Sequence, residues 1–226
     1  MALKEHKFYE AERYLAARSQ GLECGVTYCQ EERLETIDGD FCIVRFDTAP
    51  IRGASVKTVF DALLGSVLNA ETFLSDMFGS ITIREDSELE SPEIAQLRLV
   101  SLTSSAALVE SNTVVFSKLS EDANGEYGVM AQDFVDYDEL YPYRSNERVR
   151  RDTTTIVVVR LTPQIPGKPP VVVVTRWTYL KVHNSNMVVQ NPESEIKESS
   201  VCWGDTAQKC MQHIMDTATL NSPHVA

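Results

Sequence analysis

Ionisable and aromatic side chains concentrate in residues 133–152, which read DFVDYDELYPYRSNERVRRD. Within this stretch Tyr141, Pro142, Tyr143 and Arg144 follow one another. A tyrosine ring combines an apolar surface with a polar tip, and a guanidinium group can bind a carboxylate through two parallel hydrogen bonds. The string therefore suits the polar end of a bound molecule. The alternative is that the tyrosines pack the segment onto the protein while Arg144 pairs with a nearby carboxylate.

Three carboxylates precede this string and raise the question of a metal site. Asp136 and Asp138 share one face of an extended strand, with Glu139 beside them. Oxygen ligands at this spacing can hold Ca²⁺ or Mg²⁺, but a dedicated loop adds a glycine turn and further ligands. We prefer pairing with the arginines of residues 148–151, and no metal is predicted.

Cys210 and His213 come closest to a catalytic pair in this sequence. They lie one turn apart on a predicted helix, which is compatible with a thiolate–imidazole pair. However, His213 is off the apolar stripe and no third group orients it, so a packed cysteine beside a surface histidine is the preferred interpretation. The motifs of serine hydrolases, zinc proteases, dinucleotide-binding folds and P-loop proteins do not occur. No catalytic residue and no cofactor is predicted.

The side chains of residues 171–183 alternate between two faces of a strand. One face carries Arg176 among valines, and the other carries Trp177 and Tyr179. If the first face lines a cavity, Arg176 is a charge inside an apolar container and needs a carboxylate from the protein or the ligand. If the second face lines it, the two rings form the wall and Arg176 is solvated. The alternation leaves both open; we slightly prefer Trp177 inward and keep Arg176 as a candidate.

Hydrophobic periodicity and turn residues predict the elements that position these side chains. Residues 3–20 form a charged helix with few apolar positions, which can carry little core. Residues 40–48 alternate as a strand, and residues 55–78 follow helical spacing, as two helices or as one helix kinked near its middle. Six strands follow at 80–85, 94–102, 107–119, 126–137, 152–161 and 171–183, and then an amphipathic helix at 203–220 whose apolar side includes Met211, Ile214 and Met215.

An antiparallel meander places its successive connections at alternate ends of the sheet. Residues 103–106 and 138–151 should therefore share one end with the exit of the last strand. A curved sheet closed by a C-terminal helix encloses a cavity, and the segment 138–151 is predicted to form part of its rim.

This order of elements resembles the helix-grip fold of the START-like (StAR-related lipid-transfer) and birch-pollen-allergen superfamily, over Gly39–Leu220. The strings VFDALL, VESNTVVFS, DFVDYDELYPYR, ERVRRD and VVTRWTYLKVH look like the oomycete family of mating-specific proteins. The resemblance implies an α+β fold with a curved antiparallel sheet closed over a long C-terminal helix. It implies a helical extension at 1–37, a START-like domain at 38–226 and a latch-like role for 138–151. It transfers no active site.

Charge and composition exclude several classes of protein. The chain has 226 residues, 43% of them apolar, and a formal net charge of −12, so its surface repels nucleic-acid phosphates and anionic lipid headgroups. The charged first residues lack the apolar core of a signal peptide, and no apolar run can span a bilayer. Five cysteines without a CxxC pair suit reduced thiols. We predict an intracellular protein, cytoplasmic with the nucleus as the alternative, without nucleic-acid binding or integral membrane association.

Three functions remain. The leading one is noncovalent binding of a lipid or another apolar or amphipathic small molecule, for transport or sensing. The second is a regulatory or protein-interaction module with a filled cavity, whose N-terminal helix contacts a protein partner or a second copy. A cyclase-like or hydrolase-like enzyme is third. The predicted ligand-binding residues are Tyr141, Tyr143, Arg144, Arg176, Trp177, Tyr179, Met211, Ile214 and Met215.

Overall fold

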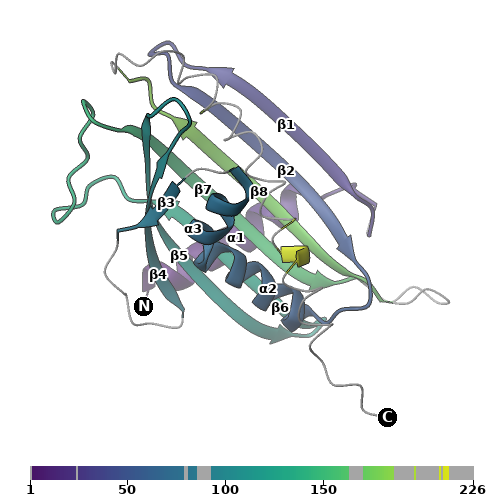
Figure 1. Ribbon diagram of the computed structural model, residues 1–226. Coiled ribbons are helices and arrows are strands. Elements are labelled where there is room, and N and C mark those ends of the chain that lie inside the picture. The colour runs from purple at the N-terminus through teal and green to yellow at the C-terminus, as the bar shows by residue number, and fades with distance from the viewer. Residues whose placement is uncertain are drawn as a thin grey trace.

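One eight-stranded sheet organises the chain (Figure 1). The computed structural model describes residues 2–23, 25–78, 81–85, 93–162, 170–185, 196, 209 and 211–213. The strands lie in the order β1-β2-β8-β7-β6-β5-β4-β3. The elements are α1 (Ala2–Arg18), β1 (Tyr28–Glu35), β2 (Phe41–Ile51), α2 (Val56–Leu68), α3 (Ala70–Phe78), β3 (Ile81–Arg84), β4 (Ile94–Leu102), β5 (Leu108–Asp122), β6 (Gly125–Phe134), β7 (Val149–Leu161) and β8 (Val172–Val182).

The predicted six-strand meander is confirmed as β3 to β8, and β4 has the predicted bounds. Neighbouring strands are antiparallel throughout this order. Because β6 ends at Phe134, the start of β5 is free to meet β7, and Val109 and Val149 pair there in a short parallel ladder. The α+β class and the antiparallel sheet are therefore confirmed.

Strand β1 was not predicted. Its sequence YCQEERLE has no apolar alternation, and nearly all of its residues are exposed. It pairs with β2 from Tyr28↔Thr48 to Glu35↔Phe41 at the edge of the sheet. An edge strand forms backbone hydrogen bonds with one neighbour only. Because both faces of β1 are in water, its side chains need no alternation of apolar and polar residues, and the sequence carries no strand pattern. Strand β1 thus belongs to the sheet although residues 1–37 were predicted to form a helical extension. The division at residue 38 stays a prediction.

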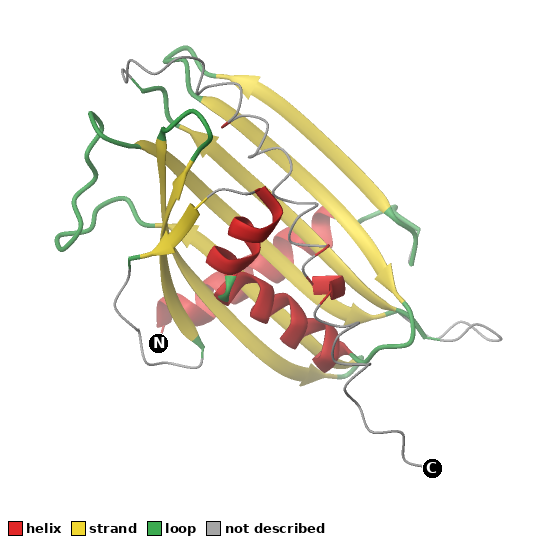
Figure 2. Cartoon of the chain, in the orientation of Figure 1, coloured by secondary structure: helices red, strands yellow, loops and turns green. Residues whose placement is uncertain are grey.

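Helices cover both faces of the sheet (Figure 2). We call the face under α2 and α3 the inner face and the face under α1 the outer face. Val59 and Leu63 of α2 pack with Met130 and Val157 on the inner face. Ser55 caps α2 by accepting a 3.1 Å hydrogen bond from the backbone N–H of Thr58. A turn at Asn69 separates α2 from α3, so the segment 55–78 forms two helices.

Helix α1 packs on the outer face of its own sheet. Phe8, Ala11 and Leu15 are each 2% exposed and lie in one cluster with Val129 and Val158. The helix thus carries more of the core than its few apolar residues suggested, because Phe8, Ala11 and Leu15 are spaced along one side. Its apolar side is used within the chain, so a partner or a second copy would meet its other sides.

The predicted C-terminal helix at 203–220 lies mostly outside the described residues, and Ile214 and Met215 lie wholly outside them. Lys209 and Met211–His213 are helical. Met211 is 2% exposed and belongs to the inner cluster of α2 and the sheet, so this part of the chain reaches the inner face. In the part of the chain that the structure describes, no helix is long and apolar enough to cross a bilayer.

We predict that Gly128→Ala destabilises the protein. A Cβ at Gly128 would lie 2.2 Å from a ring carbon of the buried Phe60 of α2, so helix and sheet would have to separate, at a cost of roughly 1–3 kcal/mol. Urea unfolding measures the change in the free energy of unfolding. Adding Phe60→Leu to Gly128→Ala should recover part of the loss, and an unchanged stability of the single variant would contradict the close contact.

Candidate functional site

A band of polar side chains crosses the middle of the inner face. We call it the polar band, and its members lie on five neighbouring strands: Arg45 and Asp47 on β2, Arg176 and Thr178 on β8, Thr155 on β7, Gln132 on β6 and Thr113 on β5. The strand register aligns Arg45, Thr178, Thr155 and Gln132 across four of these strands. The band is therefore a transverse feature of the sheet that no single strand reveals.

The charged part of the band is a chain of ion pairs. Asp47 and Arg176 are 6% and 7% exposed, and the Asp47 Oδ2 atom accepts hydrogen bonds from Nη2 and Nε of Arg176 at 2.8 and 3.1 Å. The same oxygen accepts from Nε of Arg45 at 3.0 Å, and Arg45 reaches Glu31 of β1 at 3.5 Å. Charges this deeply buried are tolerated because they are paired with short hydrogen bonds.

The neutral part of the band continues this pattern with hydroxyl and amide groups. The hydroxyls of Thr155 and Thr178 lie 3.2 Å apart, and the amide of Gln132 donates to the hydroxyl of Thr113 at 3.1 Å. A hydroxyl can donate and accept at the same time. This part of the inner face can therefore hydrogen-bond a polar group of a bound molecule.

Apolar clusters flank the polar band on both sides along the strands. Val157, Val174 and Met211 belong to the cluster under α2. Leu180 and Ile196 belong to a second cluster toward the opposite end of the same strands. The inner face thus offers apolar, polar and apolar zones in succession.

The preference for Trp177 on the cavity side is wrong. Arg176 shares the inner face with α2, and its carboxylate partner comes from the protein as Asp47. Trp177 lies on the outer face in the α1 cluster, where its ring meets Tyr14 edge-on at 5.2 Å. Tyr179 also lies on the outer face, with its hydroxyl 3.3 Å from the Cys42 sulfur. Helices cover both faces of β8, so both faces carry apolar side chains. The alternation of β8 therefore could not show which face is which.

The connection from β6 to β7 lies at the predicted end of the sheet, because Ala107, Val149 and Val182 share a cluster there. It folds onto side chains of the outer face. Asp138 accepts hydrogen bonds from Gln96 at 3.2 Å and Asn112 at 2.9 Å. The end of the sheet is thus as predicted, but the connection packs on the face opposite the polar band. Its role as the rim of a cavity stays a prediction.

The tyrosines and the arginine of this connection contact the protein itself. The Arg98 guanidinium lies 4.7 Å from the Tyr141 ring centre. The Tyr143 hydroxyl donates to the Arg148 carbonyl at 2.8 Å, and burial raises the pKa of Tyr143. Arg144 is exposed and pairs with Glu147 at 3.2 Å. A role of these residues in ligand binding stays a prediction.

The arginines that follow are paired with acids. Arg148 binds Glu110 at 2.9 Å and Glu85 at 3.2 Å, and Arg98 binds the same two carboxylates. Arg150 binds Asp152 at 2.6 Å and Asp136 at 3.5 Å. The described residues contain no group of three metal-ligating side chains. His213 is exposed, and Cys210 lies outside the described residues.

Sequence reasoning missed Asp47 as the partner of Arg176. The signal was present in the alternation of β2, where Arg45 and Asp47 share a face with Ile43. A charge at an apolar position of one strand calls for an opposite charge on its neighbour. The sequence did not show that β2 and β8 are neighbours.

Comparison with known proteins finds similarities of fold alone. No family model matches the chain, and no curated protein matches its sequence. The human StarD13 (DLC2) lipid transfer and protein localization domain is 10% identical, with a TM-score of 0.44 over 92% of this chain and 96% of that domain. A protein from Arthrobacter aurescens is 15% identical, with a TM-score of 0.32 over 86% and 97%. The di-domain ARO/CYC BexL is 11% identical, with a TM-score of 0.32 over 90% and 57%.

We predict that Asp47→Ala destabilises the protein more than Arg176→Met. Asp47→Ala removes the carboxylate that joins Arg45 and Arg176 and should cost about 3 kcal/mol or more. Arg176→Met leaves Asp47 bonded to Arg45 and should cost less than half as much. Urea unfolding of both variants gives the two free energies. Equal losses, or the reverse order, would show that Asp47 is not the centre of the chain of ion pairs.

A second prediction concerns pH. Burial alone would raise the pKa of Asp152, but hydrogen bonds from His183 and Arg150, each 2.6 Å long, outweigh it and the pKa lies below its usual value. The charged form is thus favoured by folding, and this stabilisation is present above the unfolded pKa of about 4 and is lost as pH falls through the folded pKa. Asp152→Asn should therefore destabilise at pH 7, with a difference from the wild type that shrinks below about pH 4. Urea unfolding across this range is the measurement; a difference independent of pH would contradict the pairing.

Proposed function

We propose that this chain binds an apolar or amphipathic small molecule noncovalently on the inner face of its sheet. The observation that carries the proposal is the polar band between two apolar clusters. A surface that alternates in this way complements a molecule whose apolar parts need burial and whose polar group needs hydrogen bonds.

The energetics of the band support a binding role. Replacing a buried ion pair with well-packed apolar residues is often neutral or stabilising, so stability alone does not require Asp47 and Arg176 at this position. Arg45, Gln132 and Thr178 are only partly buried. These three side chains belong to the polar band and keep part of their surface accessible. A ligand could therefore contact them.

The finer parts of the proposal extend beyond the polar band. We propose a lipid as the ligand class, with Met211, Ile214 and Met215 on the covering side and Tyr141, Tyr143 and Arg144 near the opening. Trp177, which faces α1, and Tyr179, which lies on the same outer face beside Cys42, would act only through the sheet. The START-like domain at 38–226, the kinship with oomycete mating-specific proteins and the cytoplasmic location remain parts of this hypothesis.

Native mass spectrometry of the protein purified from its own cells tests the proposal. We expect a bound small molecule on the wild type and its loss in Thr178→Phe, because the larger side chain occupies the partly buried floor of the band. Val173→Phe is the matched control, because Val173 is also partly buried on β8 but lies on the outer face, like Trp177. Thermal unfolding must show that both variants are folded, because Thr178→Phe also removes the hydroxyl contact with Thr155.

Two results would overturn this function. One is the absence of any bound molecule on the wild-type protein under gentle ionisation. The other is retention of the molecule by a folded Thr178→Phe variant, which would place the binding site away from the polar band.

A further inference from the structure

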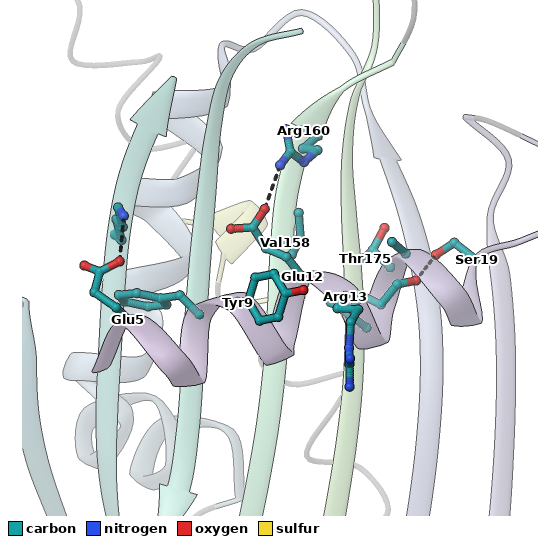
Figure 3. A pocket seen from close by; sticks show the side chains of 12 residues that line it. Glu5, Tyr9, Glu12, Arg13, Ser19, Val158, Arg160 and Thr175 are labelled. Atoms are coloured by element: carbon teal, nitrogen blue, oxygen red, sulfur yellow. Dashed lines mark hydrogen bonds and ion pairs between the residues drawn. The ribbon is translucent and has the colours of Figure 1, made fainter. Parts of the chain in front are cut away.

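A groove of about 570 Å³ runs along one flank of α1 on the outer face (Figure 3). Helix α1 forms one wall from Glu5 to Ala16, and Ser19 follows directly after the helix. Val158 of β7 and Thr175 of β8 contribute from the sheet. At 1.5 Å per residue, this part of the helix is about 20 Å long. The groove is elongated, and it lies on the opposite side of the sheet from the polar band.

Small side chains explain why this flank is hollow. Phe8 and Leu15 anchor α1 in the outer cluster. Toward the C-terminal end of the same flank stand Ala16 and Ser19, whose short side chains leave space between helix and sheet. The volume falls within the range of small-molecule sites.

The lining is more positive than the rest of the protein. The lining contains three cationic side chains, Arg13, Lys118 and Arg160, and two anionic ones, Glu5 and Glu12. The chain as a whole has a net charge of −12. Each of these cations is paired with a carboxylate: Arg13 with Glu10, Arg160 with Glu12 and Asp122, and Lys118 with Glu5. An anionic ligand would therefore have to replace one of these carboxylates.

The two cations that rise from the sheet differ in how firmly they are held. Arg160 binds Glu12 at 3.0 Å and Asp122 at 2.7 Å, and it stacks on Tyr127 at 3.9 Å. Lys118 binds Glu5 at 3.3 Å, and the Glu5 side chain is 62% exposed. An exposed pair of this kind contributes little stability, so an anion can displace Glu5 from Lys118 at small cost.

We propose that this groove binds a small anionic amphiphile, with its charged head at Lys118 and its apolar body along Phe8, Val158 and Ala16. The Lys118 ammonium lies 5.8 Å from the centre of the Phe8 ring, so the site for the head adjoins the apolar part of the groove. Binding here is independent of the function proposed for the inner face.

Isothermal titration calorimetry with laurate below its micellar concentration tests the site in the full chain. Ala16→Phe fills the groove from an exposed position and should weaken laurate binding at least tenfold. Ala17→Phe is the matched control, because Ala17 is its exposed neighbour on α1 and does not line the groove. It should bind laurate like the wild type, and so should the inner-face variant Thr178→Phe.

Charge variants test where the head binds. Lys118→Gln should weaken laurate binding several-fold, and Glu5→Gln should tighten it, because the competing carboxylate is gone. The proposal is overturned if the wild type binds no laurate, if folded Ala16→Phe binds as tightly as Ala17→Phe, or if Glu5→Gln weakens binding. Loss of laurate binding in Thr178→Phe alone would assign laurate to the inner face and also overturn it.

Discussion

The pairing of β2 with β8 is the constraint on which the rest of the structure depends. It joins the N-terminal strands to the end of the meander, from Phe41↔Val182 to Ile51↔Val172. Asp47 lies opposite Arg176 in this register, and their hydrogen bonds hold it. A slip of one residue would turn every side chain of a strand to the other face. This register decides which residues meet α2 and which meet α1, and the hydrogen bonds between Asp47 and Arg176 fit it.

Helices on both faces make the centre of the sheet a buried layer. Val157, Val158 and Val159 are consecutive in β7 and point to alternate faces, yet all three are at most 8% exposed. Antiparallel sheets often leave one face to water and then alternate clearly between apolar and polar residues. In this protein the alternation is replaced by apolar runs, and the polar residues of the band stand out against them.

Acidic and basic residues of the segment 133–152 make ion pairs and hydrogen bonds on the outer face. Arg98 and Arg148 share the carboxylates of Glu85 and Glu110, and Tyr141 covers Arg98. A network of this kind holds the long connection onto β4 and β5, because each charge satisfies two others. The density of charge that suggested a ligand contact is accounted for in large part by the folding of the segment itself.

Periodicity and turn chemistry alone determined the meander, the helical segment 55–78, and the residues that share a face on each strand. They also showed that Arg176 needs a partner if its face is covered. Only the tertiary structure decided that this partner is Asp47, that Trp177 faces α1, and that the polar strand β1 completes the sheet. The physical reason is that a period of two shows which side chains lie together but not what covers them. Strand neighbours distant in the chain are chosen by the packing of the whole sheet, and β1, exposed on both faces, carries no pattern that local sequence could reveal.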